Sequence, residues 1–235
     1  AASAAGLTGA TSVAFDITPA AASRVAFVVQ PSAVTAGASI APAVQVEVQD
    51  ALGNRVTAST ASITVAIGTN PAAGTLSGTA TLSAVAGVAT FSNLSINLSG
   101  VGYTLTAASG ALTGATSTAF NVNPGAAAAV AITTMPSGGT NGVALTPAAV
   151  VRLVDGLGNT VPTTGTTINA LLASGAGALS GTIAANTTTG VATFGNLVLT
   201  GTAGPYTINF GSTGLTGVTS PTVTLGAGAA TTIAA

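Results

Sequence analysis

Short runs of residues that alternate between hydrophobic and polar side chains occur along most of the chain. In VQVEVQ (44–49) the valines take every second position, with Gln and Glu between them. SITVAI (62–67), YTLTA (103–107) and YTINF (206–210) follow the same rule. A period of two predicts strands that bury one face and leave the other in water, as strands of antiparallel sheets do.

Turn signals separate these runs. DALGN (50–54) and DGLGN (155–159) combine Asp with Gly-Asn, which suits tight turns. The Ala run at 126–129 is too short to persist as a helix, and we interpret it as a connector. The strands expected in the first half of the chain are 25–30, 43–49, 62–67, 75–82, 88–91, 102–108 and 117–122.

The same succession of runs and turns occurs twice. GVATFSNL (87–94) returns 103 residues later as GVATFGNL (190–197). Further pairs flank this block: LSGT at 76–79 and 179–182, LTGATS at 112–117 with LTGVTS at 215–220, and DALGN with DGLGN. A repeat of about 100 residues is large enough to form one domain with its own core.

The two ends of the chain belong to the same pattern. LTGATSVAFDITP (7–19) is similar to LTGATSTAFNVNP (112–124), and residues 229–235 are similar to the start of each copy. We therefore predict an all-β protein with immunoglobulin-like β-sandwiches of about seven strands at 20–124 and 125–227. Residues 1–19 are expected to be the last strand of a preceding repeat, or an exchanged strand, and residues 228–235 the start of a following repeat.

Three blocks recur in order in both copies, and in the first copy they read PAVQVEVQDALGNRVT, GVATFSNLSI and GYTLTAAS. In order and spacing they resemble the bacterial Ig-like repeats of surface adhesins of the invasin and intimin type. This resemblance implies tandem Ig-like domains, display at the cell surface, and a spacer or adhesive role. It brings no catalytic residues with it.

The composition excludes several classes of function. Charged residues make up only 3% of the chain, with three Arg, no Lys and four acids. A nucleic-acid-binding surface needs clustered Lys and Arg, so we expect no nucleic-acid partner. No apolar run approaches the roughly 20 residues of a membrane-spanning helix, so no such segment is predicted.

The residues available for catalysis are few. The chain has no His and no Cys, which removes the usual general bases and thiol nucleophiles. Asp16 lies near a linker and is replaced by Asn121 in the next copy. Glu47 lies near Asp50, but the second copy places Arg152 and Asp155 at the corresponding positions. We therefore predict no catalytic residue, no cofactor and a non-enzymatic protein.

Calcium binding is the alternative role for these acids, since a calcium ion takes six to eight oxygen ligands, usually including several carboxylates. Asp50 and Asp155 each stand alone in a turn, so we interpret them as turn residues that bond nearby backbone, and we predict no metal site. Glu47 has Arg55 and Arg24 as candidate partners, and we interpret it as a solvated surface charge.

Two aromatic residues allow a structural and a functional interpretation. Tyr103 and Tyr206 occupy the place where a tyrosine of an immunoglobulin sandwich bonds backbone with its hydroxyl. A platform for stacking sugars is the alternative. Their inward phase favours the structural role.

Three asparagines, Asn93, Asn97 and Asn186, fit the acceptor pattern for N-glycosylation. A surface with so few charges has little to keep copies apart, which predicts self-association or covering glycans. The sequence thus favours a structural repeat module of an extracellular stalk, filament or sheath that acts as spacer or assembly unit. The alternative is an adhesive module that recognises a glycan or a host surface.

Overall fold

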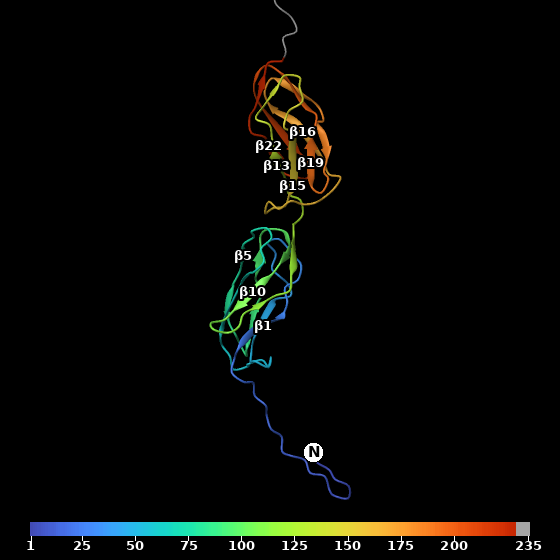
Figure 1. Cartoon of the computed structure of the whole chain (residues 1–235). Coiled ribbons are helices and arrows are strands. Elements are labelled where there is room, and N and C mark those ends of the chain that lie inside the picture. The colour runs from blue at the N-terminus through green and yellow to red at the C-terminus, as the bar shows by residue number, and fades with distance from the viewer. Residues whose placement is uncertain (229–235) are drawn as a thin grey trace, which may run out of the picture.

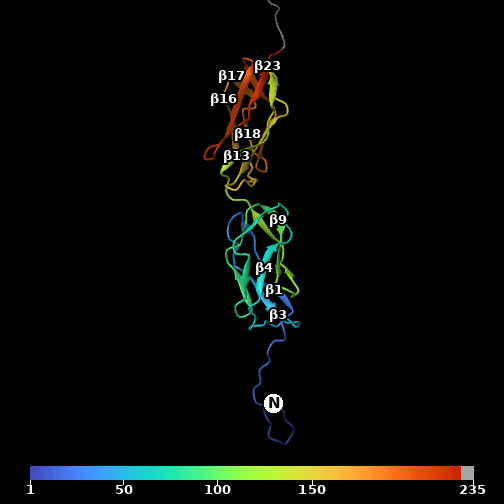
Figure 2. The same ribbon diagram turned by 90° about the vertical axis from the view of Figure 1, so that its left-hand side faces the viewer.

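Two β-sandwiches follow one another along the long axis of the molecule (Figures 1 and 2). The computed structural model describes residues 1–228, and all regular secondary structure in this part is β-strand. The first sandwich contains strands β1 to β12 and the second contains β13 to β23. The predicted all-β class with immunoglobulin-like sandwiches is confirmed.

The first sandwich has two main layers. One layer has the order β1 (Arg24–Val29), β3 (Val44–Gln49) and β7 (Val88–Phe91). The other has the order β11 (Ala115–Thr116), β10 (Leu105–Ala108), β4 (Ser62–Ile67) and β6 (Thr81–Ser83). The remaining strands are β2 (Val34–Thr35), β12 (Phe120–Asn123) and β9 (Gly100–Tyr103) in one small sheet, and β5 (Leu76–Ser77) with β8 (Ser95–Ile96).

The second sandwich repeats this plan. Its first layer is β13 (Ala129–Thr134), β15 (Ala149–Val154) and β19 (Val191–Phe194). Its second layer is β14 (Gly138–Thr140), β23 (Val223–Gly226), β21 (Gly204–Gly211), β16 (Thr167–Ser174) and β18 (Ala184–Asn186), with β22 (Val218–Thr219) also on β21. The pair β17 (Gly177–Gly181) and β20 (Leu197–Gly201) completes it.

The start of each sandwich passes from its first layer to a second sheet. In the first, β1 pairs antiparallel with β3, whereas β2 runs parallel to the last strand, β12. In the second, β13 pairs with β15, and β14 runs parallel to β23. Consecutive strands therefore belong to different sheets, so the chain itself links two sheets of each sandwich.

Four details differ from the sequence prediction. The strand expected at 102–108 is two strands, β9 and β10, which belong to different sheets. The strand expected at 75–82 is two strands, β5 and β6, which pair with β8 and β4 and are separated by Gly78 with φ of +101°. β2 and β14 were not expected, because runs of two or three residues carry no alternation. The Ala run at 126–129 is only partly a connector, since Ala128 N donates to Val154 O and Ala129 begins β13.

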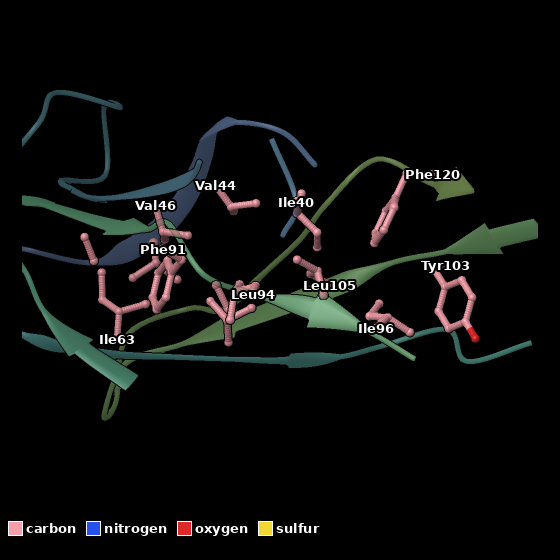
Figure 3. Close-up of a cluster of buried hydrophobic side chains, with 14 of the residues drawn as sticks. Ile40, Val44, Val46, Ile63, Phe91, Leu94, Ile96, Tyr103, Leu105 and Phe120 are labelled. Atoms are coloured by element: carbon pink, nitrogen blue, oxygen red, sulfur yellow. The ribbon is translucent and has the colours of Figure 1, made fainter. Parts of the chain in front are cut away.

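The hydrophobic residues at alternate positions form two separate cores. The first lies between Val25 and Val122, and the second between Val130 and Leu225. Figure 3 shows the first core, where Val44 and Val46 from one layer face Ile63 and Leu105 from the other. The predicted inward phase of the strands is therefore confirmed, although whether 20–124 and 125–227 are independent domains stays a prediction.

The N-terminal segment joins neither core. Residues 1–18 are exposed, and an isolated bridge between Ala2 and Ala10 is their only strand-type pairing within the described chain. The prediction that residues 1–19 belong to a preceding repeat is thus neither confirmed nor contradicted by their packing. The following repeat expected at 228–235 lies outside the described residues, apart from Gly228.

The glycine of the repeated block G-V-A-T-F is required for a steric reason. This glycine, Gly87 or Gly190, has φ of +79° or +83° and ends a turn just before β7 or β19. A Cβ at Gly190 would lie 2.1 Å from Val161 O, and one at Gly87 would lie 2.6 Å from Val56 O. Only glycine fits here, because a side chain would meet backbone that cannot rotate away.

Replacing this glycine should therefore destabilise one sandwich. We expect Gly190→Ala to lower the free energy of unfolding of the second sandwich by about 1–3 kcal/mol, the usual range for a strained backbone position. Denaturant unfolding followed by amide NMR signals measures it. The matched control is Gly195→Ala, whose new Cβ meets nothing within 4 Å. Equal losses for both variants would contradict the steric explanation.

Candidate functional site

The place where the two sandwiches meet is built around one carboxylate. The connector leaves β12 at Pro124, and Gly125 N then donates to Asp155 Oδ2 at 2.8 Å. Asp155 belongs to the DGLGN turn that follows β15, and the residue is only 5% exposed. One buried side chain of the second sandwich thus fixes the path by which the chain enters it.

The same carboxylate closes its own turn. Asp155 Oδ1 accepts hydrogen bonds from Leu157 N and Asn159 N, both at 2.9 Å, and Asn159 Nδ2 donates to Oδ2 at 3.0 Å. Asp50 does the same in the first sandwich, where it binds Ala20 N at 3.0 Å together with the DALGN turn. The interpretation of both acids as turn residues is confirmed, and the contact with the connector is an addition.

These hydrogen bonds favour the charged form of both acids. The hydrogen bond from the Asn54 side chain, helped by backbone N–H groups and opposed by burial, lowers the pKa of Asp50 to about 2. Burial acts to raise the pKa of Asp155, but the hydrogen bonds from Gly125 N and Asn159 outweigh it, so this pKa also lies below its usual value. Both turns therefore hold a full negative charge at neutral pH.

Asn159 extends this cluster across the joint. Its Oδ1 accepts a hydrogen bond from Ser99 N at 2.8 Å, and its Nδ2 donates to Asn97 O at 3.0 Å. Because both partners are backbone groups of the loop between β8 and β9, the contact depends on the shape of that loop more than on its side chains. Asn159 was not singled out by the sequence analysis, and its only signal was the recurrence of Asn at the end of both Asp-Gly turns.

An apolar contact lies beside these hydrogen bonds. Leu157 Cδ1 lies so close to Gly37 that a Cβ at residue 37 would be 2.8 Å away from it. Gly37 has φ of +79° and follows β2 of the first sandwich. The joint therefore combines the anchored connector, two cross-joint hydrogen bonds and one leucine packed on backbone.

Both tyrosines are structural. Tyr103 is fully buried, and its hydroxyl donates to Leu98 O at 2.9 Å. The Tyr206 hydroxyl lies 2.7 Å from Thr202 O and 2.8 Å from Ala176 O, so it can donate to either. The predicted bond from hydroxyl to backbone is confirmed, and the buried rings offer no face for stacking a sugar.

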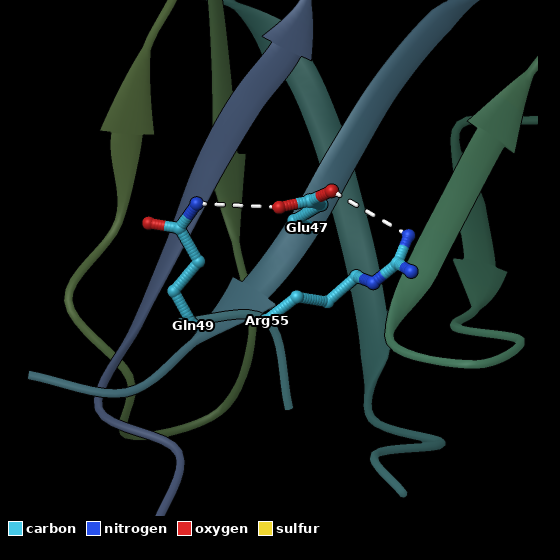
Figure 4. Close-up of polar contacts among 3 residues, drawn as sticks. All are labelled: Glu47, Gln49 and Arg55. Carbon is cyan, nitrogen blue, oxygen red and sulfur yellow. Dashed lines mark hydrogen bonds and ion pairs between the residues drawn. The ribbon is translucent and has the colours of Figure 1, made fainter. Parts of the chain in front are cut away.

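The charges on the outer face of the first sandwich form a weak network (Figure 4). Glu47 Oε1 lies 3.8 Å from an Arg55 nitrogen, and Gln49 Nε2 donates to Glu47 Oε2 at 3.3 Å. Arg24 bonds Gln49 instead of Glu47. A pair at this distance, with Arg55 exposed and Glu47 partly buried, contributes about 0–1 kcal/mol, which agrees with a surface role.

The three candidate glycosylation residues are all exposed. Each is held through its side-chain oxygen: Asn93 binds Thr79 N, Asn97 binds Thr75 N, and Asn186 binds Thr167 Oγ1. Asn97 also lies in the loop that contacts Asn159. Modification of these residues stays a prediction.

Other sites for ligands are scarce in the part of the chain that the structure describes. Among residues 1–228, no group of three or more acids, His or Cys gathers where a metal ion could sit. No helix within the same residues has the length and apolarity to cross a membrane. A shallow hollow of about 320 Å³ lies on the second sandwich, where Asn169, Leu171 and Asn209 are among the lining residues.

Comparison with known proteins identifies similar folds and no sequence relatives. No known protein family matches the chain, and no curated protein sequence is similar to it. Similar solved structures include FdeC, an adhesin of Escherichia coli, at 17% identity and a TM-score of 0.39 over 91% of this chain and 67% of FdeC. InvE, an adhesin of Yersinia pseudotuberculosis, is 16% identical with a TM-score of 0.33 over 86% of this chain and 58% of InvE.

Enzyme chains also occur among the similar structures. A β-glycosidase from Bacteroides vulgatus is 12% identical with a TM-score of 0.36 over 87% of this chain and 25% of the enzyme. The chain spans about two thirds of FdeC and a smaller part of the other two proteins. At identities of 12–17% and TM-scores below 0.5, these similarities assign neither a family nor an activity. Bacterial surface adhesins do occur among the structural neighbours, as the sequence resemblance predicted.

Acid should weaken the first sandwich through Asp50. Its pKa falls from 3.8 to about 2 on folding, so its contribution is complete above pH 3.8 and is lost as the pH falls through 2. We expect the stability of the first sandwich, measured by denaturant unfolding between pH 5 and pH 2, to decline in this window. Asp50→Asn should lower stability at pH 5 and flatten the decline. A decline that is unchanged in this variant would contradict the assignment.

Removal of the Asn159 side chain should loosen the joint. Asn159→Ala leaves Ser99 N and Asn97 O without their cross-joint partner, at a cost of about 1 kcal/mol for each lost hydrogen bond. Residual dipolar couplings measure the order of one sandwich relative to the other, which should fall.

The matched control is Asn54→Ala, which removes the same bond to the turn carboxylate in the first sandwich and no contact at the joint. The relative order of the two sandwiches should stay at its native value in this control. Equal order in both variants and the native chain would show that Asn159 does not hold the joint.

Proposed function

We propose that this chain is a non-enzymatic structural segment of an extracellular stalk, filament or sheath, and that it acts as a spacer. The observation that carries the proposal is the joint, where Asp155 holds the connector and Asn159 binds the loop of the other sandwich. A spacer must transmit position along its length, and a joint fixed by partly buried hydrogen bonds supports this better than a free linker does.

The chemistry of the chain supports the absence of an enzymatic role. Asp50 and Asp155 use their oxygens for their own turns and for the connectors, and the two acids lie in different sandwiches. Glu47 pairs with Arg55 on an outer face. Within residues 1–228, the hydrogen-bond and ion-pair partners of these acids are backbone N–H groups and Asn, Gln or Arg side chains, and none is the second acid or nucleophile that paired acid–base chemistry requires.

Self-association is the second part of the proposal. With 3% charged residues and a net charge of −1, copies repel one another weakly. Large hydrophobic side chains on the surface, such as Val85 and Val101 at 77% exposure each, add area that lateral contacts can bury. Glycans at Asn93, Asn97 or Asn186 are the alternative cover for this surface.

Electron microscopy of the purified protein over a range of concentrations tests the assembly role, and intact mass tests the glycans. We expect straight two-sandwich rods that associate side by side into ordered fibres as concentration rises. Bent, freely jointed particles that stay monomeric would contradict both the spacer and the assembly role.

A binding role is favoured by one specific observation. The hollow lined by Asn169, Leu171 and Asn209 combines amides with an exposed apolar side chain, and the first sandwich has Thr64, Ala66 and Thr106 at the matching positions. This difference between the copies fits a glycan ligand at the second sandwich only. Binding to a glycan array that is lost in Asn169→Ala and Asn209→Ala would establish this function, and no binding by the native chain would remove it.

A further inference from the structure

The exposed N-terminal segment has the internal geometry of a hairpin that each sandwich contains near its end. Ala2 and Ala10 form an antiparallel pair, and the equivalent pairs are Ala107 with Ala115 and Phe210 with Val218. The turn inside each hairpin also repeats. The donor is a leucine N–H in all three: Leu7 N to Ala4 O at 3.1 Å, Leu112 N to Ser109 O at 2.9 Å, and Leu215 N to Ser212 O at 3.1 Å.

The hydrophobic side chains of this segment lack the core that their equivalents have. Phe15 and Ile17 are 78% and 85% exposed, whereas the matching Phe120 and Val122 are 5% and 2% exposed. Leu7 is exposed as well, while its match Leu112 packs against the first core. The segment therefore carries the apolar face of a final strand with nothing packed on it in the described chain.

The surface from which this segment emerges matches the joint between the two sandwiches. Asp50 Oδ2 holds Ala20 N at 3.0 Å, just as Asp155 Oδ2 holds Gly125 N at 2.8 Å. The connector therefore enters the first sandwich by the same anchored path as the second. The two entry surfaces differ in what they contact. The surface of the second sandwich contacts the first sandwich, whereas that of the first sandwich contacts no sandwich within residues 1–228.

Within residues 1–228, two side chains at this surface contact no other sandwich, whereas their equivalents in the second sandwich do. Leu157 packs on Gly37, and Asn159 is 6% exposed and bonded to the preceding loop. The matching Leu52 is 85% exposed, and Asn54 is exposed and bonds only within its own turn in the described chain. We call the surface formed by Asp50, Leu52 and Asn54 the head surface. It carries the same kinds of side chain as the joint, but no sandwich packs on it within residues 1–228.

We propose that residues 1–19 are the closing hairpin of a further β-sandwich of the same kind, and that the head surface forms a joint with it. In this joint Leu52 packs on the backbone that corresponds to Gly37, and Asn54 binds the loop that corresponds to 97–99. The inference rests on the proposed spacer role and deepens it, since it gives each joint of the stalk the same chemistry.

The occupant is a sandwich on the N-terminal side within the same polypeptide, and not a second copy of this chain. In a second copy, both sandwiches already contain their own closing strands, β11 with β12 and β22 with β23, paired with their neighbours. A second copy offers a place for residues 1–19 only if it releases one of these. The anchored connector at Ala20 instead places the partner directly beside the head surface.

The full chain extended at its N-terminus tests the proposal. Because Ala1 matches Thr106, a second copy of residues 20–105 placed before Ala1 supplies the missing part of a sandwich that residues 1–19 then close. We expect a third set of dispersed amide signals and protection of Phe15. In the extended chain we expect Phe15→Asp to unfold the added sandwich and Phe120→Asp to unfold the first sandwich. In the native chain, Phe15→Asp should change nothing, because Phe15 is 78% exposed.

A control extension separates a wrong assignment from a poor fusion. In it, residues 1–19 carry the sequence of residues 106–124, so the added part duplicates the first sandwich. If the control yields a third sandwich and the native segment does not, the proposal is overturned. It is also overturned if the extended chain folds and tolerates Phe15→Asp.

The head surface has its own readout. In the extended chain, Leu52→Asp combined with Asn54→Ala should lower the order of the added sandwich relative to the first in residual dipolar couplings, whereas the native chain should keep its couplings. No change in the extended chain would overturn the proposed joint. These outcomes leave the spacer role itself to the microscopy above, so a failure of the extra sandwich and a failure of the stalk are distinguishable.

Discussion

Each sandwich has one buried carboxylate, Asp50 or Asp155, that binds three parts of the chain at once: the connector, the turn after the second long strand, and the asparagine that ends this turn. No other acidic side chain in the described residues is held by so many donors. Because a buried charge is costly unless its hydrogen bonds are complete, the carboxylate enforces the geometry of its partners. Asp155 thereby fixes the point at which the connector enters the second sandwich.

On the outer faces of the sandwiches, neighbouring strands are linked by neutral side chains and not by the charged pairs of ordinary protein surfaces. Hydroxyl and amide side chains pair across strands, for example Thr64 with Thr81 at 2.9 Å and Ser174 with Thr207 at 2.7 Å. These pairs are neutral, so they support the sheets without adding repulsion between molecules. The same composition that stabilises each sandwich thus leaves its surface free to pack against copies or to carry glycans.

Alternation and the repeat made most of the fold predictable. The inward residues of β3, β4 and β21 follow from the period of two, because one face of each strand is buried throughout. The split of the strand at 75–82 was not predictable, since the break at Gly78 is set by close approach of the Asn93 backbone. The short strands β2 and β14 were missed for a related reason. They pair with the last strand because the chain passes from one sheet to another there, and their own residues carry no sign of this.

For the candidate site, the sequence determined that Asp50 and Asp155 are turn residues, because an Asp before Gly-Asn bonds nearby backbone wherever it stands. It also determined the two-layer sandwich, since alternate burial and a repeat of one domain's length leave few other architectures. Only the tertiary structure decided that these carboxylates hold the connectors, that Asn159 spans the joint, and that Phe15 and Ile17 lie outside any core. Those contacts join residues 30 to 62 positions apart, or leave a strand without a partner, and local pattern carries no information about such distances.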